Sequence, residues 1–295
     1  MDRKAEIEIR DQGIMVRSPN GSLTLPVTAL PAPLISWFAE GKLDIYRQLL
    51  ADPAKVDFFH QHLPVLVTHV PGSPFPFNCG NKGVGFLPKH EFLAGYIELY
   101  RQTIEASKSI PWRNSLPDRI TAARSFHENR EAIDFRCLTS IEIFQKQTFR
   151  NLQHYPLASL LFTGSTPEYR SFQLNCAVEI IDREDPRFTF IRLSRRLFEF
   201  DGFHIAQPDF AYGYIFWISE IMDKTPHRVA EQTARDSEAA PVTLRWDEEA
   251  LSILLTVPAW HRSQMKNQIE RYGVERGFER ITMEVVAEAR KVLRH

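Results

Sequence analysis

The sequence predicts an α+β protein, with mixed helices and antiparallel strands in a large N-terminal domain followed by a small three-helix C-terminal module. Three observations support this prediction. Short alternating strands open the chain and return after residue 168, amphipathic helical segments lie between them, and the C-terminal residues combine helical periodicity with helix start and stop signals. The predicted boundaries are 1–222 for the large domain, 223–243 for a polar linker and 244–295 for the module.

The first half of the chain begins with strands and continues mainly as helices. Residues 6–10, 14–17 and 22–27 alternate apolar and polar side chains around glycine-containing turns, which predicts an antiparallel meander. Residues 63–70 are strand-like, and the Pro- and Gly-rich run 71–88 predicts a loop. Helical spacing of apolar residues predicts helices over 34–50, 56–62, 88–106, 117–132 and 139–153.

The second half of the large domain changes to β-rich sequence. Residues 169–181 and 187–200 are predicted as two strands joined by a hairpin at 182–186. Periodicity does not distinguish a strand from a buried helix over the apolar segment 210–221. Residues 223–243 are polar and turn-prone, as expected of an inter-domain linker.

Composition limits the function classes. The 295 residues are 43% hydrophobic, enough for a full core, and the formal net charge of −1 indicates neither nucleic acid nor an anionic membrane as a partner. The most notable apolar stretch, 214–218, is too short to span a bilayer, and the charged start of the chain does not resemble a secretion signal. The three cysteines lie far apart, which is typical of a reducing compartment. We therefore expect a cytoplasmic protein.

Three groups of polar residues are of the types that bind metals or phosphates, but none of them has the spacing of a known binding motif. His60 and His62 would share one face of a strand, but on the predicted helix they diverge, so ordinary histidines are favoured over a metal site. Residues 79–85 offer glycine amides and a lysine, without the spacing of a phosphate-binding P-loop. Such a long loop is still expected to act as a lid or to contact a cofactor. Separate core thiols are favoured over a shared iron–sulfur cluster for Cys79, Cys137 and Cys176.

The most unusual segment of the large domain is the aromatic run 198–217, which follows a group of arginines. Aromatic rings stack on a tetrapyrrole macrocycle, a histidine ligates its metal, and guanidinium groups grip its carboxylates. His204 is the best candidate for an axial ligand because it lies among the aromatic residues. The residue types alone favour the simpler interpretation that the aromatic side chains form core and the arginines are a solvated strand edge, and a tetrapyrrole site is the alternative. The predicted cofactor-binding residues are His204, Arg192, Arg195, Arg196, Tyr212 and Trp217.

The C-terminal module carries matched helix signals. Asp247 stands at an N-cap position before two glutamates, and Pro258 starts a second helix. Gly277 is placed to end that helix, and Thr282 to cap a third. The buried face of the third helix is predicted to be Val285, Val286, Ala289, Val292 and Leu293.

The order of these signals has a known counterpart. Acidic residues follow Trp246, a Val-Pro pair breaks the first helix, and Ile281-Thr282 opens a helix containing Glu-Val-Val and Glu-Ala-Arg. This pattern resembles the small C-terminal PCP-red domain of the light-independent protochlorophyllide reductase B subunit. The resemblance covers about a sixth of the chain and implies an appendage near a tetrapyrrole site that supplies no iron–sulfur ligands. The reductase's long α/β domains have no counterpart here, so its activity is not implied.

These observations favour an accessory or binding protein of tetrapyrrole or (bacterio)chlorophyll-related metabolism. The cofactor is left open, with a tetrapyrrole as the candidate. The alternative is an adaptor that docks on a nitrogenase-like or other redox complex through 244–295, without binding pigment. A stand-alone enzyme of another fold stays open, since no residues indicate a reaction. A DNA-reading role for the module is disfavoured because residues 246–295 carry eight basic and eight acidic side chains.

Overall fold

The computed structural model describes residues 6–10, 13–18, 21–52, 56, 61–69, 72–164, 170–199, 210–225, 244–256 and 259–292. These residues form helices and mostly antiparallel strands, which confirms the predicted α+β class. Those up to Thr225 form one compact unit, the N-terminal unit, and those from residue 244 belong to a second, the C-terminal unit. Residues 226–243, most of the predicted linker, lie outside the described residues.

The opening meander is confirmed. Strands β1 (Glu6–Arg10), β2 (Gly13–Ser18) and β3 (Gly21–Pro26) form an antiparallel sheet in that order. Ile14 and Val16 of β2 are buried in the core of the N-terminal unit. Alternation of apolar and polar side chains thus gives this small sheet one face to pack against the rest of the unit.

The main sheet has six antiparallel strands in the order β5-β4-β7-β8-β9-β6. The strands are β4 (Val65–His69), β5 (Phe77–Asn81), β6 (Cys137–Glu142), β7 (Leu157–Thr163), β8 (Ser171–Asp182) and β9 (Tyr212–Asp223). The predicted strands over 63–70 and 169–181 are therefore confirmed, and the ambiguous segment 210–221 is a strand.

The main sheet curls until its two edges meet. Beyond β5, Gly85 exchanges backbone hydrogen bonds with Thr139 of β6, at N–O distances of 2.9 and 2.8 Å. The Nζ of Lys82 lies 2.6 Å from a carboxylate oxygen of Glu142, at the end of β6. These contacts join the residues that follow the edge strand β5 to the other edge strand, β6. We call this junction the seam.

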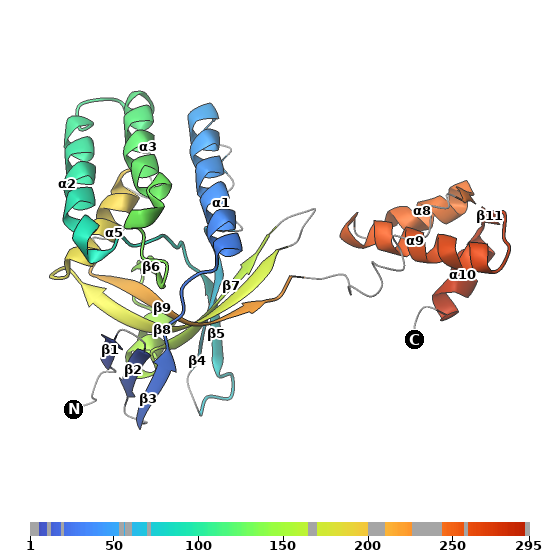
Figure 1. The fold of residues 1–295 in the computed structure, drawn as a ribbon, viewed down its shortest axis with the longest axis horizontal. Helices are drawn as coiled ribbons and strands as arrows, with labels where there is room; N and C mark the ends of the chain where they lie inside the picture. The colour runs from blue at the N-terminus through green and yellow to red at the C-terminus, as the bar shows by residue number, and fades with distance from the viewer. Residues whose placement is uncertain are drawn as a thin grey trace. The chain divides into compact units, whose positions relative to one another are not determined.

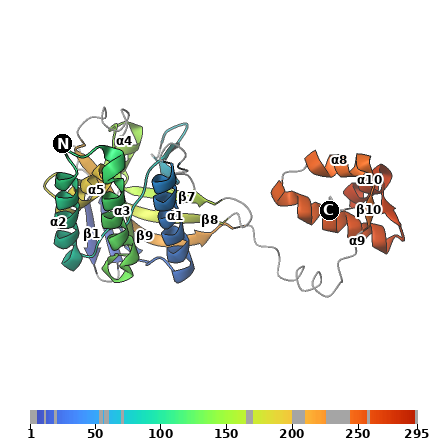
Figure 2. The same ribbon diagram turned by 90° about the horizontal axis from the view of Figure 1, so that it is seen from above.

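The longer helices cover one face of the main sheet, opposite the β1–β3 sheet (Figures 1 and 2). Helix α3 packs against both α1 and α2, and α2 also packs against α5. The short α4 packs against β4, β5 and β8. The helices of this unit are α1 (Ala32–Ala51), α2 (His90–Ala106), α3 (Trp112–Glu128), α4 (Gln147–His154) and α5 (Pro186–Arg196).

Three local predictions for this unit are wrong. Residues 187–200 are not a strand, since α5 occupies 186–196: the Asp185 side chain accepts a hydrogen bond from the Arg187 N–H at 2.8 Å, and Pro186 stands at the first helical position. The predicted loop 71–88 contains β5, which forms because β4 supplies a pairing partner. The helix predicted over 139–153 begins only at Gln147, because residues 139–142 belong to β6 and residues 143–146 connect the strand to the helix.

The C-terminal unit consists of three helices and a two-residue parallel strand pair. Its elements are β10 (Arg245–Trp246), α8 (Glu248–Thr256), α9 (Ala259–Glu275), β11 (Arg280–Ile281) and α10 (Met283–Val292). Gly277 has the left-handed backbone (φ 74°) expected after a helix, and the hydroxyl of Thr282 accepts from the Val285 N–H at 3.5 Å. Val285, Val286 and Ala289 are buried as predicted. The prediction for Val292 is wrong, since it is 53% exposed beyond the end of this core.

None of the helices in the described parts of the chain has both the length and the apolar character needed to cross a membrane.

Candidate functional site

A cavity of about 630 Å³ lies in the N-terminal unit beside the seam. Residues of α1, α2, α3 and α5 line it on the helical side, and residues 80–86 and 139–142 line it along the seam. Its volume lies in the range of sites that enclose small molecules and cofactors. Most of the lining is apolar, with seven phenylalanine and tyrosine side chains: Tyr46, Phe86, Tyr100, Phe126, Phe144, Phe190 and Phe198.

One wall of the cavity contains a buried lysine. Lys42 stands on the apolar face of α1 between Phe38 and Tyr46 and is only 9% exposed. Its Nζ contacts Nδ1 of His62 and donates to the Val84 carbonyl oxygen at 3.2 Å. Among the described residues it forms no ion pair with a carboxylate. Burial lowers the pKa of Lys42 to about 7, because desolvation penalises its charged form.

Two imidazoles line the same cavity. Burial holds the pKa of His62 well below its usual value, and the charges of Lys42 and His127 lower it further. Burial, followed by the charge of Lys42, lowers the pKa of His127 to about 4. Both rings are therefore neutral at neutral pH.

The surroundings of His127 fix its tautomer. Nδ1 lies 2.8 Å from the Ala123 carbonyl oxygen, which only accepts, so Nδ1 carries the proton. The hydroxyl of Tyr46 lies 3.1 Å from the same nitrogen. Nε2 then holds the lone pair, and among the described residues it has no hydrogen-bond partner. A ring that donates from one nitrogen to a backbone carbonyl is oriented as histidine ligands of metals commonly are.

A buried carboxylate closes the seam end of the cavity. Glu142 accepts hydrogen bonds from Lys82 and from the hydroxyl of Tyr214, each at 2.6 Å, and from the N–H groups of Phe144 and Gln145 at 2.9 and 2.6 Å. Burial raises the pKa of Glu142, but the bonds from Lys82 and Tyr214 and the charge of Lys82 outweigh burial and lower it. Glu142 is therefore ionised and its negative charge is neutralised by Lys82.

Of the predicted site residues on α5, one reaches the cavity. Arg195 lines it, with its guanidinium 4.9 Å from the ring centroid of Phe210 and its Nε 3.4 Å from Glu199. Arg192 and Arg196 lie on the same helix but not in the cavity wall, and the Arg196 carbonyl accepts a hydrogen bond from Arg119. His204, the predicted axial ligand, lies outside the described residues.

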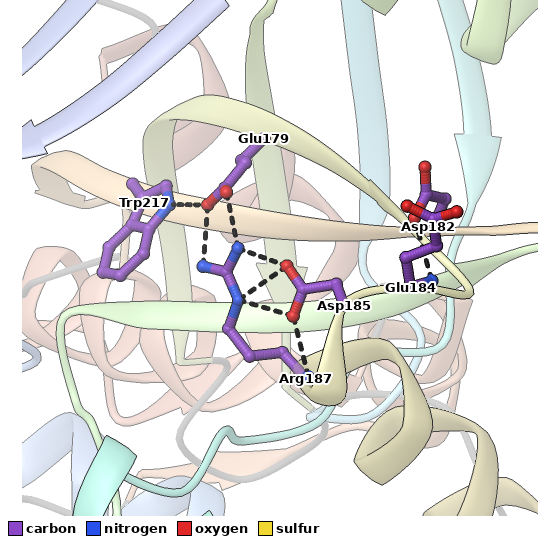
Figure 3. Close-up of polar contacts among 6 residues, drawn as sticks. All are labelled: Glu179, Asp182, Glu184, Asp185, Arg187 and Trp217. Atoms are coloured by element: carbon purple, nitrogen blue, oxygen red, sulfur yellow. Dashed lines mark hydrogen bonds and ion pairs between the residues drawn. The ribbon is translucent and has the colours of Figure 1, made fainter.

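Tyr212 and Trp217 do not line this cavity. Tyr212 packs its ring against Phe149, with centroids 4.8 Å apart. The indole N–H of Trp217 donates to Glu179 at 2.9 Å, and Figure 3 shows this carboxylate shared with Arg187, which also binds Asp185. The bridge ties the start of α5 to β8 and β9. Trp217 is thus a structural contact in this part of the fold.

Some of the residues considered for metal or phosphate chemistry line the cavity, and others do not. Residues 80–86 of the predicted Pro/Gly loop line the cavity, as does His62 of the histidine cluster. Cys137 and Cys176 are separate buried thiols, whereas Cys79 is exposed, so the prediction of three core thiols is wrong for Cys79. The described residues contain no grouping of three or more His, Cys, Asp or Glu side chains suited to hold a metal ion.

Lys42, Tyr46 and His127 were missed from the sequence. They lie on two helices, with Tyr46 and His127 81 positions apart in the sequence, and only the packing of α1 on α3 brings them together. One signal was present: Lys42 interrupts an otherwise apolar helical stripe, Phe38, Ile45 and Leu49. A lysine in such a stripe is expected either to extend to water or to serve a site.

Two solved structures are similar to part of this chain. HupZ of Group A Streptococcus is 9% identical, and the match covers 56% of this chain and 86% of that chain at a TM-score of 0.33. A structure described as F420 reductase is 12% identical, with coverages of 55% and 89% and a TM-score of 0.29. No curated protein matches the chain.

The C-terminal unit has a family match. Residues 246–290 match the model of the family described as the proto-chlorophyllide reductase 57 kD subunit, and no family model matches the rest of the chain. The resemblance predicted from the Trp246 and Ile281-Thr282 signatures is therefore confirmed for this unit. The match is short, and it suggests a link to protochlorophyllide reductase-related chlorophyll metabolism.

Proposed function

We propose that this chain is a cytoplasmic accessory protein of chlorophyll-related metabolism that binds a tetrapyrrole in the cavity beside the seam. The observation that carries the proposal is an apolar, aromatic cavity of about 630 Å³ that also holds neutral imidazoles and cationic side chains. Aromatic rings stack on a macrocycle, while Arg195 offers positive charge to its carboxylates. The family match of residues 246–290 supports the choice of ligand class.

Two histidines are proposed for different reasons as the ligand of a metallated macrocycle. His127 is favoured by its geometry, since Nδ1 is held by the Ala123 carbonyl and Nε2 keeps its lone pair. His204 remains a proposal from the sequence, as do the carboxylate-binding roles of Arg192 and Arg196. Tyr212 and Trp217 have other partners in the described structure and are not included in the proposed cavity site.

The test is a titration of the purified full-length chain with haem and, separately, with metal-free protoporphyrin IX, followed by visible absorption. We expect a Soret shift with both. His127→Ala should remove the ligation-dependent part of the haem shift and leave protoporphyrin binding in place. Exposed His154, replaced by alanine, is the matched control. If His204→Ala abolishes the haem-specific shift instead, His204 is the axial ligand.

Arg195→Ala is expected to weaken binding of both macrocycles by about 1–3 kcal/mol, because a charge-assisted hydrogen bond to a carboxylate is lost. Arg101→Ala, on the exposed face of α2, should leave affinity unchanged. Absence of any spectral shift with either macrocycle would overturn the proposal of a pigment site.

A second candidate is the docking adaptor, and the surface of α8 favours it. Leu251 and Leu255 lie one helical turn apart and are 41% and 57% exposed, while Leu254 is buried. Exposed apolar side chains in neighbouring positions often mark a protein contact. Because of the family match, the partner we propose is a subunit of a light-independent protochlorophyllide reductase complex.

For this candidate we expect the full-length chain to co-sediment with purified reductase components in analytical ultracentrifugation. A double Leu251→Ser, Leu255→Ser variant should lose the complex, since the apolar contact area is removed. Leu23→Ser, at an exposed leucine of β3, is the control. A complex that survives the double substitution would exclude this face of α8 as the docking surface.

A further inference from the structure

We propose that the ε-amine of Lys42 forms a Schiff base with an aldehyde or ketone group of a conjugated, mainly apolar ligand held in the cavity. The inference goes beyond tetrapyrrole binding, because it assigns a covalent site and depends only on a carbonyl group within the ligand.

The hydrogen bonds of Lys42 leave one position on its nitrogen open. A neutral amine has two hydrogens and one lone pair. The Val84 carbonyl oxygen only accepts and takes one hydrogen of Nζ, and Nδ1 of His62 takes the other in the tautomer that carries its proton on Nε2. The lone pair of Nζ is then left without a hydrogen-bond role, and the Lys42 side chain lines the cavity.

Burial favours this neutral form, and the groups around Lys42 supply no compensating negative charge. His62 and His127 are neutral at neutral pH, and Tyr46, one turn along α1, keeps its proton because burial raises its pKa. The nearest carboxylate on the seam, Glu142, is engaged by Lys82 and Tyr214. A pKa of about 7 leaves about half of the Lys42 amine unprotonated at neutral pH.

The reaction balances without an oxidant or reductant. The lone pair of Nζ attacks the carbonyl carbon, a C–N bond forms, and the carbonyl oxygen becomes a hydroxyl. The two amine protons leave with that oxygen as one water molecule, and a C=N bond remains. Nδ1 of His62 is placed to accept one of these protons from Nζ and pass it on. The apolar lining limits water near the imine and so disfavours its hydrolysis.

The test uses 1-naphthaldehyde as the probe, with sodium cyanoborohydride to reduce an imine to a stable amine. Full-length protein is treated at pH values from 5 to 9, and each lysine is quantified by peptide mass spectrometry. We expect Lys42 to be labelled at least 10-fold faster than exposed Lys108 at pH 7. The amine of an ordinary lysine is unprotonated in only about one molecule in 2,500 at that pH. The much larger unprotonated fraction of Lys42 outweighs the lower nucleophilicity of its less basic amine. The rate at Lys42 should level off above pH 7.

The controls separate the covalent site from general surface labelling. Lys42→Met should remove the fast adduct, and Lys108→Arg should retain it. If Lys42→Met fails to fold, the labelling rates of the individual lysines in the wild-type chain still test the proposal. Lys42 labelled no faster than Lys108, or with a rate that keeps rising to pH 9, would overturn the proposal. Naphthaldehyde is not a tetrapyrrole, so this outcome is independent of the haem and protoporphyrin titrations.

Discussion

Glu142→Ala is expected to lower the free energy of unfolding of the N-terminal unit by about 3 kcal/mol. The substitution leaves the Lys82 ammonium without its counter-charge beside an apolar cavity. It also removes the acceptor for the buried Tyr214 hydroxyl and for the N–H groups of Phe144 and Gln145. For a unit of this size the loss corresponds to a fall in Tm of roughly 6–12 °C, measurable by circular dichroism.

Two substitutions serve as controls for this effect. Glu98→Ala removes a carboxylate from an exposed pair with Arg101 and should cost less than about 1 kcal/mol. Glu142→Gln keeps the shape and some hydrogen bonds and should fall between the wild type and Glu142→Ala. Equal stability of Glu142→Ala and Glu98→Ala would show that the seam does not depend on the buried carboxylate.

The same carboxylate makes stability depend on pH. The folded-state pKa of Glu142 is held below its ordinary value of 4.5, so its contribution is fully present above about pH 5. The contribution is lost as pH falls through the lowered folded-state pKa. We therefore expect the stability difference between the wild type and Glu142→Gln to shrink as the pH falls below 4.5. A difference that stays constant down to pH 3 would contradict the assigned pKa direction.

The parts of the fold that were predictable are those in which local signals and packing agree. The β1–β3 meander has alternating side chains and turns marked by Gly13 and Gly21, and Gly21 has the positive φ (126°) that glycine tolerates best. The C-terminal unit was predictable because its caps lie at the helix ends, as with Thr282. In these segments the local sequence determines most of the secondary structure.

The failures have the opposite cause. The alternating Phe188 and Phe190 suggested a strand, although the Asp185-Pro186 pair is a helix-start signal and determined the outcome. Strand β5 has little strand character of its own and depends on pairing with β4 across the turn. In both cases apolar periodicity over a short window was weaker evidence than capping or tertiary pairing.

The cavity could not be predicted from sequence because its polar groups come from separate elements. Arg195 was identified by its position before the aromatic run, and it lines the cavity. Lys42 and His127 reach the same cavity only when α1 and α3 pack together over the seam. Trp217 shows the converse, since an aromatic residue of the same run is bound to Glu179 instead. The aromatic run therefore contributes Phe198 to the cavity lining, but it did not indicate the polar residues that line the cavity.

Val286→Asp is expected to unfold the C-terminal unit within the full-length chain. Val286 is 3% exposed in a small core with Ile269, Val285 and Ala289. A carboxylate there has no partner to compensate its desolvation, and the cost is several kcal/mol. A unit of about fifty residues has a total stability of only about 3–7 kcal/mol, so the loss approaches the whole amount. Hydrogen–deuterium exchange of the peptides from residues 244–292 is the measurement.

The exposure of Val292 provides the matched control on the same helix. Val292→Asp adds the same charge to α10 at a side chain that is 53% exposed, so its effect should stay within about 0.5 kcal/mol apart from a small helix-dipole term. The core of the N-terminal unit contains no residue of this helix, so peptides up to Thr225 should keep their protection in both variants. Comparable deprotection in Val286→Asp and Val292→Asp would mean that α10 does not pack through Val285, Val286 and Ala289. Loss of protection in the N-terminal unit as well would mean that the two cores unfold together, because only a coupled transition carries a local defect from one core to the other.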